Sequence, residues 1–231
     1  MRLLVIIGTL LTFSTVAQAA PSFSASKEKL AKWYAQNPVP TLYCGCDVTW
    51  KGKKGIPDLT SCGYEVRKQP TRANRIEFEH ATTAFAMGNQ RQCWKDGGRK
   101  NCIATDPKFK EMEADAHNLF TSIGEVNGDR SNYRFSQWNG IQGATYGQCE
   151  MQIDFKARKA MPPERSRGVV ARAQLYISER YDIKLSSADR RLFEAWNNTY
   201  APQAWECKRN KYIETWQGND NPFVSRSCTL K

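Results

Sequence analysis

Short stretches in which apolar and polar residues alternate predict β-strands in several parts of the chain. The clearest runs from Glu150 to Phe155. In the shorter stretch over residues 75–78, the same pattern places Ile76 and Phe78 on one face of a strand and Glu77 on the other. Less regular patterns predict extended segments over Leu42–Trp50, Gly63–Lys68 and Asn132–Trp138.

Apolar residues that recur every three or four positions predict helices near the start of the chain and throughout its second half. Val169, Ala173 and Tyr176 share one such face. The predicted helices span Ser24–Gln36, Asp106–Leu119, Pro163–Tyr181, a stretch that Ser186 opens, and Gln203–Trp216, whereas Arg91–Cys102 is expected to be a loop. With no internal repeat or linker, the pattern predicts a single α+β domain with mixed short strands and a helical layer.

The first nineteen residues have the features of a secretory signal peptide. Arg2 gives a short basic start, the run from Leu3 to Val16 is mostly apolar, and Ala17-Gln18-Ala19 is a small-residue cleavage site. No later stretch is apolar enough to span a bilayer. We therefore expect a periplasmic or extracellular monomer without a membrane segment, with its single domain over residues 20–231.

The chain is strongly basic, with a formal net charge of +11 that becomes +10 once Arg2 is removed. This charge favours polyanionic partners such as nucleic acid, although it would also suit adhesion to an anionic cell surface. Basic residues concentrate over residues 51–54, 67–75, 91–100 and 156–172. Within the first three of these windows, the expected contacts with a nucleic-acid backbone are Lys53, Lys54, Arg67, Lys68, Arg72 and Lys100.

The residues from Glu79 to Asn127 contain the chemistry of a hydrolytic centre. The chain has only two histidines, His80 and His117, and the ordinary pKa of either suits a proton acceptor near neutral pH. Glu79 offers a carboxylate and Asn127 an amide oxygen, ligands that suit Mg²⁺ or Ca²⁺, although an Asn beside a glycine is also typical of a turn. A regular strand would direct Glu79 and His80 to opposite faces, so this hypothesis requires the strand to end or twist near Glu79.

Glu113 and His117 are possible supports of such a centre. They are four residues apart in the predicted helix Asp106–Leu119 and would share one of its faces. We expect a mutual salt bridge that orients one of them. A second catalytic role for His117 is the alternative.

A series of short motifs follows in order from Tyr43 to Cys228. The motifs are Cys44-Gly45-Cys46, Lys53-Lys54-Gly55-Ile56-Pro57, Cys62-Gly63-Tyr64, Glu79-His80, Cys93-Trp94, Gly97-Gly98-Arg99-Lys100-Asn101-Cys102, Met112-Glu113-Ala114-Asp115, His117-Asn118-Leu119, Gly124 through Asn132, Phe135 through Gly140, Met161-Pro162-Pro163 and Trp205-Glu206-Cys207. Together they resemble the bacterial secreted endonuclease I family, within the ββα-metal, or His-metal-finger, nucleases. The chain departs from the usual family sequence at two places. Ala81 to Phe85 replaces a usual Val-Val-Pro-Ala-Trp, and Phe120-Thr121 replaces a usual Thr-Pro.

The resemblance implies roles for individual residues. His80 is implied as the general base, Glu79 and Asn127 as the ligands of one divalent cation, and Arg99 as a contact with the substrate phosphate. The cation is implied to be Mg²⁺, with Ca²⁺ or Mn²⁺ as alternatives. The family also implies a ββα-metal element at the core of the α+β domain.

Eight cysteines in an exported chain predict four disulfides, although roughly a hundred pairings are formally possible. A zinc site is disfavoured because the chain has no Cys-x-x-Cys pair. The pairs that we expect are Cys44–Cys149, Cys46–Cys62, Cys93–Cys102 and Cys207–Cys228. The third of these would stiffen the loop that carries Arg99.

The residues, together with what the resemblance implies about action on both DNA and RNA, lead to one expected function and two alternatives. We expect a non-specific endonuclease that hydrolyses DNA and RNA with one divalent cation and leaves 5′-phosphates. A metal-independent ribonuclease that uses His80 and His117 as an acid–base pair is the first alternative. The second is a non-catalytic basic module that binds nucleic acid.

Overall fold

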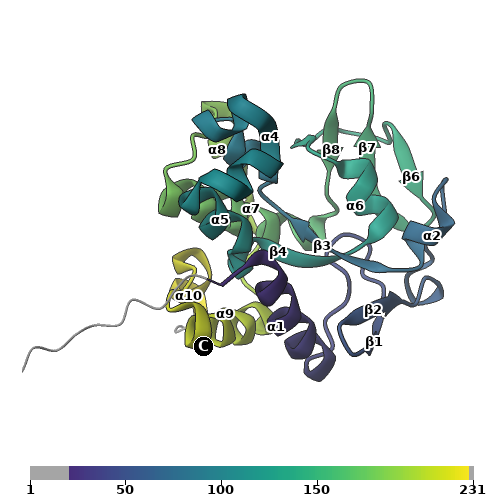
Figure 1. Ribbon diagram of the computed structural model, residues 1–231. Coiled ribbons are helices and arrows are strands. Elements are labelled where there is room, and N and C mark those ends of the chain that lie inside the picture. The colour runs from purple at the N-terminus through teal and green to yellow at the C-terminus, as the bar shows by residue number, and fades with distance from the viewer. Residues whose placement is uncertain (1–20, 229–231) are drawn as a thin grey trace, which may run out of the picture.

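A two-stranded antiparallel ribbon and the helix that follows it cross the middle of the molecule (Figure 1). The computed structural model describes residues 21–228, so the expected signal peptide lies outside the described residues. The ribbon pairs β3 (Ile76–His80) with β4 (Leu119–Ile123), and α6 (Gly124–Arg130) begins directly after β4 and contacts both strands. This is the expected ββα element.

A helical insertion separates the two strands of the ribbon in the sequence. It contains α3 (Ala84–Gly88), α4 (Gln92–Thr105), α5 (Pro107–Ala114) and the 3₁₀ turn η2 (Ala116–Asn118). Asn118 accepts a hydrogen bond from the backbone N–H of Thr82 through Oδ1 and donates one to the Thr82 carbonyl through Nδ2. These reciprocal bonds fix the segment after His80, where the sequence departs from the family pattern.

Short strands form two further sheets on the other side of the ribbon (Figure 1). The larger has the order β5–β8–β7–β6, made of Arg134–Phe135, Lys159–Met161, Cys149–Asp154 and Ala144–Tyr146. Its β5–β8 pair is parallel and its other pairs are antiparallel, so the sheet is mixed. The smaller is the hairpin of β1 (Val48–Lys51) and β2 (Lys54–Pro57).

The remaining helices lie around the ribbon and the sheets. They are α1 (Phe23–Gln36), η1 (Thr60–Cys62), α2 (Pro70–Ala73), α7 (Glu164–Tyr181), α8 (Ser187–Thr199), α9 (Ala204–Gln217) and α10 (Pro222–Cys228). Helix α7 is the most buried, because its apolar residues contribute both to the main core and to the core under the helical insertion. A buried ion pair between Arg172 and Glu206 joins α7 to α9.

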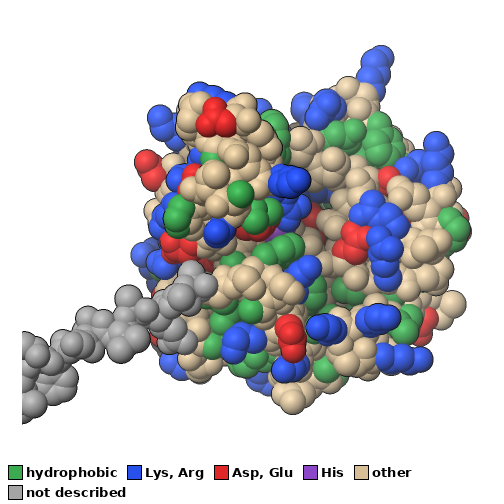
Figure 2. All heavy atoms as spheres, viewed as in Figure 1, with side chains coloured by type: hydrophobic (Ala, Val, Ile, Leu, Met, Phe, Trp, Pro, Cys, Tyr) green, Lys and Arg blue, Asp and Glu red, His purple; other side chains and the backbone are tan. Residues whose placement is uncertain are grey.

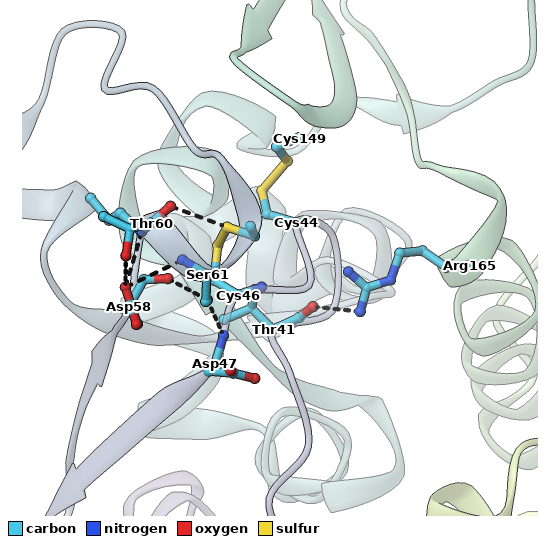
Figure 3. Close-up of a disulfide and its surroundings, with 11 residues drawn as sticks. Thr41, Cys44, Cys46, Asp47, Asp58, Thr60, Ser61, Cys149 and Arg165 are labelled. Atoms are coloured by element: carbon cyan, nitrogen blue, oxygen red, sulfur yellow. Dashed lines mark hydrogen bonds between the residues drawn. A yellow bond between two sulfur atoms is a disulfide. The ribbon is translucent and has the colours of Figure 1, made fainter.

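Four disulfides hold the segments between these elements, and they are the pairs expected from the sequence: Cys44–Cys149, Cys46–Cys62, Cys93–Cys102 and Cys207–Cys228. Figure 3 shows the first two side by side, linking the segment before β1 to β7 and to the turn that ends at Cys62. Asp58 organises that turn by accepting hydrogen bonds from Thr60 and Ser61.

The structure corrects several predicted elements. Residues 91–102 were expected to be a loop, but all of them except Arg91 lie in α4, which contains a break at Gly97-Gly98. The predicted helix Asp106–Leu119 ends at Ala114, because Asp115 caps the turn η2 instead. The predicted strand Leu42–Trp50 shortens to β1, and Asn132–Trp138 shortens to β5, while residues 63–68 form only a single bridge at Tyr64.

Candidate active site

The residues expected to form a hydrolytic centre line one cavity beside the ribbon. Its volume is about 760 Å³, and its walls include Glu79, His80, Arg99 and Asn127. These four side chains come from the end of β3, from α4 and from α6. The fold therefore gathers residues that lie far apart in the sequence.

The strand β3 ends at His80, as the hypothesis required, and its last two side chains are both buried. Arg130, at the end of α6, donates hydrogen bonds to the carbonyl oxygens of His80 and Ala81, each at 2.8 Å. These carbonyls consequently have a partner where the regular strand stops. The cavity is lined by both Glu79 and His80 as a result.

One carboxylate oxygen of Glu79 accepts hydrogen bonds from two neighbouring side chains. Its Oε1 accepts hydrogen bonds from the Tyr43 hydroxyl at 2.6 Å and from Nη1 of Arg130 at 2.8 Å. Burial raises the pKa of the Glu79 carboxyl, and Arg130 and Tyr43 oppose that rise. Because both bonds reach Oε1, the other oxygen, Oε2, is available and could bind a cation.

The amide of Asn127 is oriented by a neighbouring carboxylate. Its Nδ2 donates to Oε2 of Glu77 at 2.8 Å, so Oδ1 is the atom left for a cation. Glu77 also accepts hydrogen bonds from Arg72 and Arg75. Burial alone would raise the pKa of Glu77, but the bonds from Arg72 and Arg75 bring it below its ordinary value. Glu77 thus remains an acceptor for the Asn127 amide at neutral pH.

The imidazole of His80 is held in one tautomer by a backbone carbonyl. Its Nε2 lies 2.8 Å from the carbonyl oxygen of Glu113, which can only accept a hydrogen bond, so Nε2 carries the proton. Burial lowers the pKa of His80 to about 4; the Glu113 carbonyl opposes this, while Arg99 adds to it. At neutral pH the ring is therefore uncharged, with Nδ1 free to accept a proton.

Arg99 follows directly after the break in α4. Gly98 has φ +64°, a conformation that other residues rarely adopt, and the Cys93–Cys102 disulfide spans the break. The Nε of Arg99 donates to Oε1 of Glu113 at 2.6 Å. With the side chain 45% exposed, its two terminal amino groups remain able to bind a phosphate.

Helix α1 closes one side of the cavity with Phe23. The Phe23 ring lies 4.8 Å from the His80 ring, measured between centroids. The Nζ of Lys27 lies 4.3 Å from the centroid of the Phe23 ring, and the guanidinium of Arg99 lies 5.7 Å from that centroid. The N-terminal helix thus covers the imidazole and brings an additional cation to the cavity.

The oxygen atoms at this site fit a hard divalent cation. Among residues 21–228, no group of three or more His, Cys, Asp or Glu side chains could hold a metal ion. A cation here would therefore rely on Oε2 of Glu79 and Oδ1 of Asn127, and its other positions would be filled by water and substrate. Mg²⁺ is commonly bound by a few protein oxygens in this way.

The predicted salt bridge between Glu113 and His117 is wrong. Helix α5 ends at Ala114, so the two residues are not on one helical face, and Glu113 pairs with Arg99 instead. The Nε2 of His117 lies 3.0 Å from the carbonyl oxygen of Asn219, and its ring contacts Tyr176. His117 is not among the residues that line the cavity.

Lys and Arg side chains lie on both sides of a hollow in the middle of the face shown in Figure 2. Of the six expected contacts with a nucleic-acid backbone, Lys53, Lys54, Lys68 and Lys100 are exposed. Arg67 is instead paired with Asp129, and Arg72 with Glu77. The two arginines therefore have less free charge to offer a phosphate than the lysines.

Sequence reasoning missed the residues that hold the site side chains in place through direct contacts. Tyr43 and Arg130 hold Glu79, Glu77 holds Asn127, and Phe23 covers His80. Glu77 alone could have been suspected, because it lies two residues before Glu79 on a strand and so shares its face. The others are joined to the site only by the tertiary fold.

The chain is similar to known nucleases over nearly its whole length. A sequence model of the Endonuclease I family matches residues 22–228. The chain is 54% identical over 210 residues to an extracellular deoxyribonuclease of Aeromonas hydrophila, covering 90% of this chain and 91% of that protein. It is 50% identical over 225 residues to a periplasmic deoxyribonuclease of the same species, covering 96% and 94%. It is also 48% identical over 196 residues to endonuclease-1 of Buchnera aphidicola subsp. Acyrthosiphon pisum, covering 85% and 78%. With a matching family model and a cavity that contains its motif residues, the chain belongs to the endonuclease I family.

Proposed function

We propose that the protein is a secreted or periplasmic endonuclease that hydrolyses phosphodiester bonds of DNA and RNA with one divalent cation, Mg²⁺ or alternatively Ca²⁺ or Mn²⁺. It acts as a monomer with little sequence preference and leaves 5′-phosphates. The observation that carries the proposal is the single cavity lined by Glu79, His80, Arg99 and Asn127. DNA as a substrate is further supported by the names of the two Aeromonas relatives, which are deoxyribonucleases.

Location outside the cytoplasm has independent support. The same relatives are named extracellular and periplasmic. The described cysteines are paired in four disulfides, which form and persist in oxidising compartments. None of the helices within residues 21–228 has the length and apolar character needed to cross a bilayer.

In the proposed mechanism, His80 is the general base. Because the Glu113 carbonyl fixes the proton on Nε2, the ring accepts the proton of the attacking water at Nδ1. Arg99 binds a phosphate oxygen through its terminal amino groups while Glu113 holds its Nε. A divalent cation held by Glu79 and Asn127 would supply positive charge next to the leaving 3′ oxygen. Phe23, lying against the imidazole, limits the access of other water molecules to it.

Little sequence preference follows from the kind of contacts that the cavity offers. Arg99, Lys27 and Lys53 line it with positive charge, which suits phosphate groups. Contacts with phosphate and sugar position a protein but carry no direct sequence information. The same contacts exist in DNA and RNA, so both are expected substrates.

The test is cleavage of plasmid DNA and of RNA, first with Mg²⁺ and then with EDTA. The proposal expects both substrates to be cut with Mg²⁺ and neither with EDTA. His80→Ala should reduce the rate by about 10²–10⁴-fold, the usual contribution of a general base, while its circular dichroism stays that of the native protein. End-labelling of the products should detect 5′-phosphates.

Two outcomes would point to the alternatives. Cleavage of RNA alone that survives EDTA would favour a metal-independent ribonuclease, although the structure does not bring His80 and His117 into one cavity. Binding of plasmid without cleavage would favour a non-catalytic module. Near-native cleavage by His80→Ala would show that His80 is not the base.

A further inference from the structure

Several aromatic rings line the catalytic cavity, and one of them has a largely free face. Trp50 and Phe78 lie 6.3 Å apart and both contact Tyr34, while Phe23 lies against His80. Phe85 is different. Among the described residues its one ring neighbour is Trp94, which it meets edge to face at 5.9 Å and 82°, and 42% of the residue is exposed.

The residues behind Phe85 are capped and closely packed. Phe85 is in α3, whose first turn is capped by Thr83, and Oγ1 of Thr83 accepts a hydrogen bond from the Ala86 N–H at 3.0 Å. Trp94 packs against Phe109 of the core at 5.8 Å. Trp94 also lies so close to Gly88 that a Cβ there would come within 1.9 Å of its ring. The Phe85 ring is therefore backed by a closely packed surface.

The position of Phe85 is between the catalytic cavity and a second one. The second cavity has a volume of about 370 Å³, and the two share Thr83, Phe85 and Asn132 as wall residues. The walls of the second cavity combine amides such as Asn89 with the cation Lys184 and with the ion pair between Arg134 and Asp189. A ligand bound at the catalytic centre can therefore extend over Phe85 into a mixed polar and apolar space.

We propose that Phe85, backed by Trp94, is a stacking platform for one nucleobase of the substrate, next to the phosphate that is cleaved. The inference rests on the proposed function and identifies a subsite for it. The charge of the cavity favours this occupant, because Lys27, Lys53 and Arg99 attract an anion while the neighbouring ring offers a planar apolar face. A nucleic-acid chain alternates these two groups, whereas a lipid or an apolar peptide does not.

The platform has a consequence for the choice of substrate. A base that lies on Phe85 has left the stack of its own strand, which costs less in single strands and at mismatches than in a perfect duplex. Every base has a π face, so stacking on an aromatic side chain tolerates all sequences and both DNA and RNA. Unpaired segments should therefore bind in preference to duplex.

The test removes the Phe85 ring from the protein and the nucleobases from the oligonucleotide in separate experiments. In the His80→Ala background with Mg²⁺, the Kd of a fluorescent oligothymidylate is compared with that of an abasic oligonucleotide of equal length, which keeps the phosphates and lacks the bases. Phe85→Ala should weaken binding of oligothymidylate about 5- to 100-fold, the range that base–aromatic stacking gives, and should leave binding of the abasic chain unchanged. Phe85→Trp should retain the preference for the chain with bases, and Phe85→Leu should lose most of it.

Ile141→Ala is the matched control, because Ile141 is a 79% exposed apolar residue outside both cavities. It should change neither Kd. The ratio of the two Kd values within one variant does not depend on the fraction of folded protein. Equal weakening of both oligonucleotides by Phe85→Ala, or no weakening of either, would overturn the platform.

The same samples separate this failure from failure of the proposed function. An electrophoresis gel run after each titration should show intact oligothymidylate, because the general base has been removed. Cleavage at the wild-type rate would refute His80 as the base. The Kd ratio, measured on both oligonucleotides at times too early for cleavage, would still decide whether Phe85 stacks on a base.

Discussion

Arg99 donates a hydrogen bond from its Nε to a carboxylate oxygen of Glu113 across 2.6 Å. The backbone carbonyl of the same Glu113 receives the Nε2–H of His80. One residue at the end of α5 therefore positions both the proposed base and the proposed phosphate ligand. Its side chain and its backbone have separate tasks, which allows them to be tested separately.

Glu113→Gln should lower kcat about tenfold and leave the fold intact. The substitution weakens the charge-assisted bond to Arg99, and such bonds are roughly twice as strong as neutral ones. The carbonyl that holds His80 remains, so the loss should be smaller than in His80→Ala. Steady-state cleavage of plasmid DNA measures it. Glu111→Gln is the control on the same helix, because Glu111 makes only exposed pairs with Lys108 and Arg180. Equal losses in both variants would contradict a positioning role for Glu113.

Glu77→Gln should raise the Mg²⁺ concentration needed for half-maximal activity about 10- to 100-fold, the usual effect of removing a group that orients a metal ligand. Gln can turn its own amide toward Asn127 and so lose the fixed orientation of Oδ1. Saturating Mg²⁺ should restore kcat. Titration of Mn²⁺ by calorimetry gives a second readout that does not depend on activity.

The control for Glu77 is Glu164→Gln, because Glu164 is a 72% exposed carboxylate at the start of α7. It should leave the Mg²⁺ dependence as in the wild type. A Glu77→Gln protein with unchanged Mg²⁺ dependence and a lower kcat would show that Glu77 acts on another step.

Local patterns predicted the fold well where an element is amphipathic and capped by its own sequence. Helix α8 begins after Ser186, whose hydroxyl caps it as expected, and the alternation at Glu150 does mark a strand, β7. Prediction failed where tertiary contacts decide. Asp115 uses its carboxylate to cap η2 and to accept bonds from Tyr176 and Tyr181, which ends α5 early. No local pattern indicates partners that lie on another helix.

The same distinction applies to the site. The identities of Glu79, His80, Asn127 and Arg99 came from residue types and from the resemblance, and these residues do line one cavity. The hydrogen-bond partners of these residues could not be identified from residue types or from the resemblance. The buried bond from Tyr43 to Glu79 joins residues 36 positions apart, and the bond from Arg130 joins residues 51 apart. Such pairs depend on the whole arrangement of the ribbon and α6.

Removing the Cys93–Cys102 disulfide should strongly reduce kcat and only modestly reduce the stability of the fold. The bridge spans the break in α4 that directs Arg99, and it closes a short loop, so it restricts the unfolded chain less than a long-range bridge does. Cys93→Ser with Cys102→Ser should therefore lose about tenfold or more in kcat with a modest fall in Tm. The fully reduced protein should be nearly inactive.

Cys207→Ser with Cys228→Ser provides the matched comparison. This bridge joins α9 to α10, and its cysteines are not among the residues that line the cavity. Its removal should lower Tm and leave kcat unchanged below the melting temperature. If both double variants lose activity in proportion to Tm, the first bridge has no special effect on Arg99. Full activity with every thiol confirmed free would also contradict the prediction.

The ion pair between Arg91 and Asp106 predicts a stability contribution that disappears in acid. Hydrogen bonds from Arg91 lower the pKa of Asp106; burial opposes this, and the Phe109 N–H adds to it. Because the folded pKa is below the unfolded one, the stabilisation is present above the unfolded pKa of about 4 and is lost as pH falls through the folded pKa.

Asp106→Asn should lower Tm by about 2–4 °C at pH 7, for a pair on the order of 1 kcal/mol in a domain of this size. Asn still caps α5, so the change isolates the charge. Thermal melts from neutral to acidic pH should show the difference shrinking to zero. Asp96→Asn, an exposed position on α4, should follow the wild-type profile. A difference that persists at low pH would mean that the loss is structural and not electrostatic.

The basic surface predicts a steep dependence of binding on salt, to which the lysines and arginines contribute unequally. Lys100 is exposed and has no acidic partner among the described residues, and Lys53 is 75% exposed, 3.9 Å from Glu28. Arg67 is different, because both oxygens of Asp129 already accept its hydrogen bonds. A Lys or Arg side chain contributes to the slope of log Kd against log salt only if it neutralises a phosphate and so releases that phosphate's counterions.

Lys53→Gln and Lys100→Gln should therefore each reduce that slope by about one, whereas Arg67→Gln should leave it unchanged and lower Tm. Fluorescence anisotropy with a duplex of mixed sequence, in the His80→Ala background, measures all three. A wild-type slope near zero would contradict binding of the nucleic-acid backbone by these basic residues. A slope that falls as much in Arg67→Gln as in the lysine variants would mean that Asp129 releases Arg67 to the phosphate when nucleic acid binds.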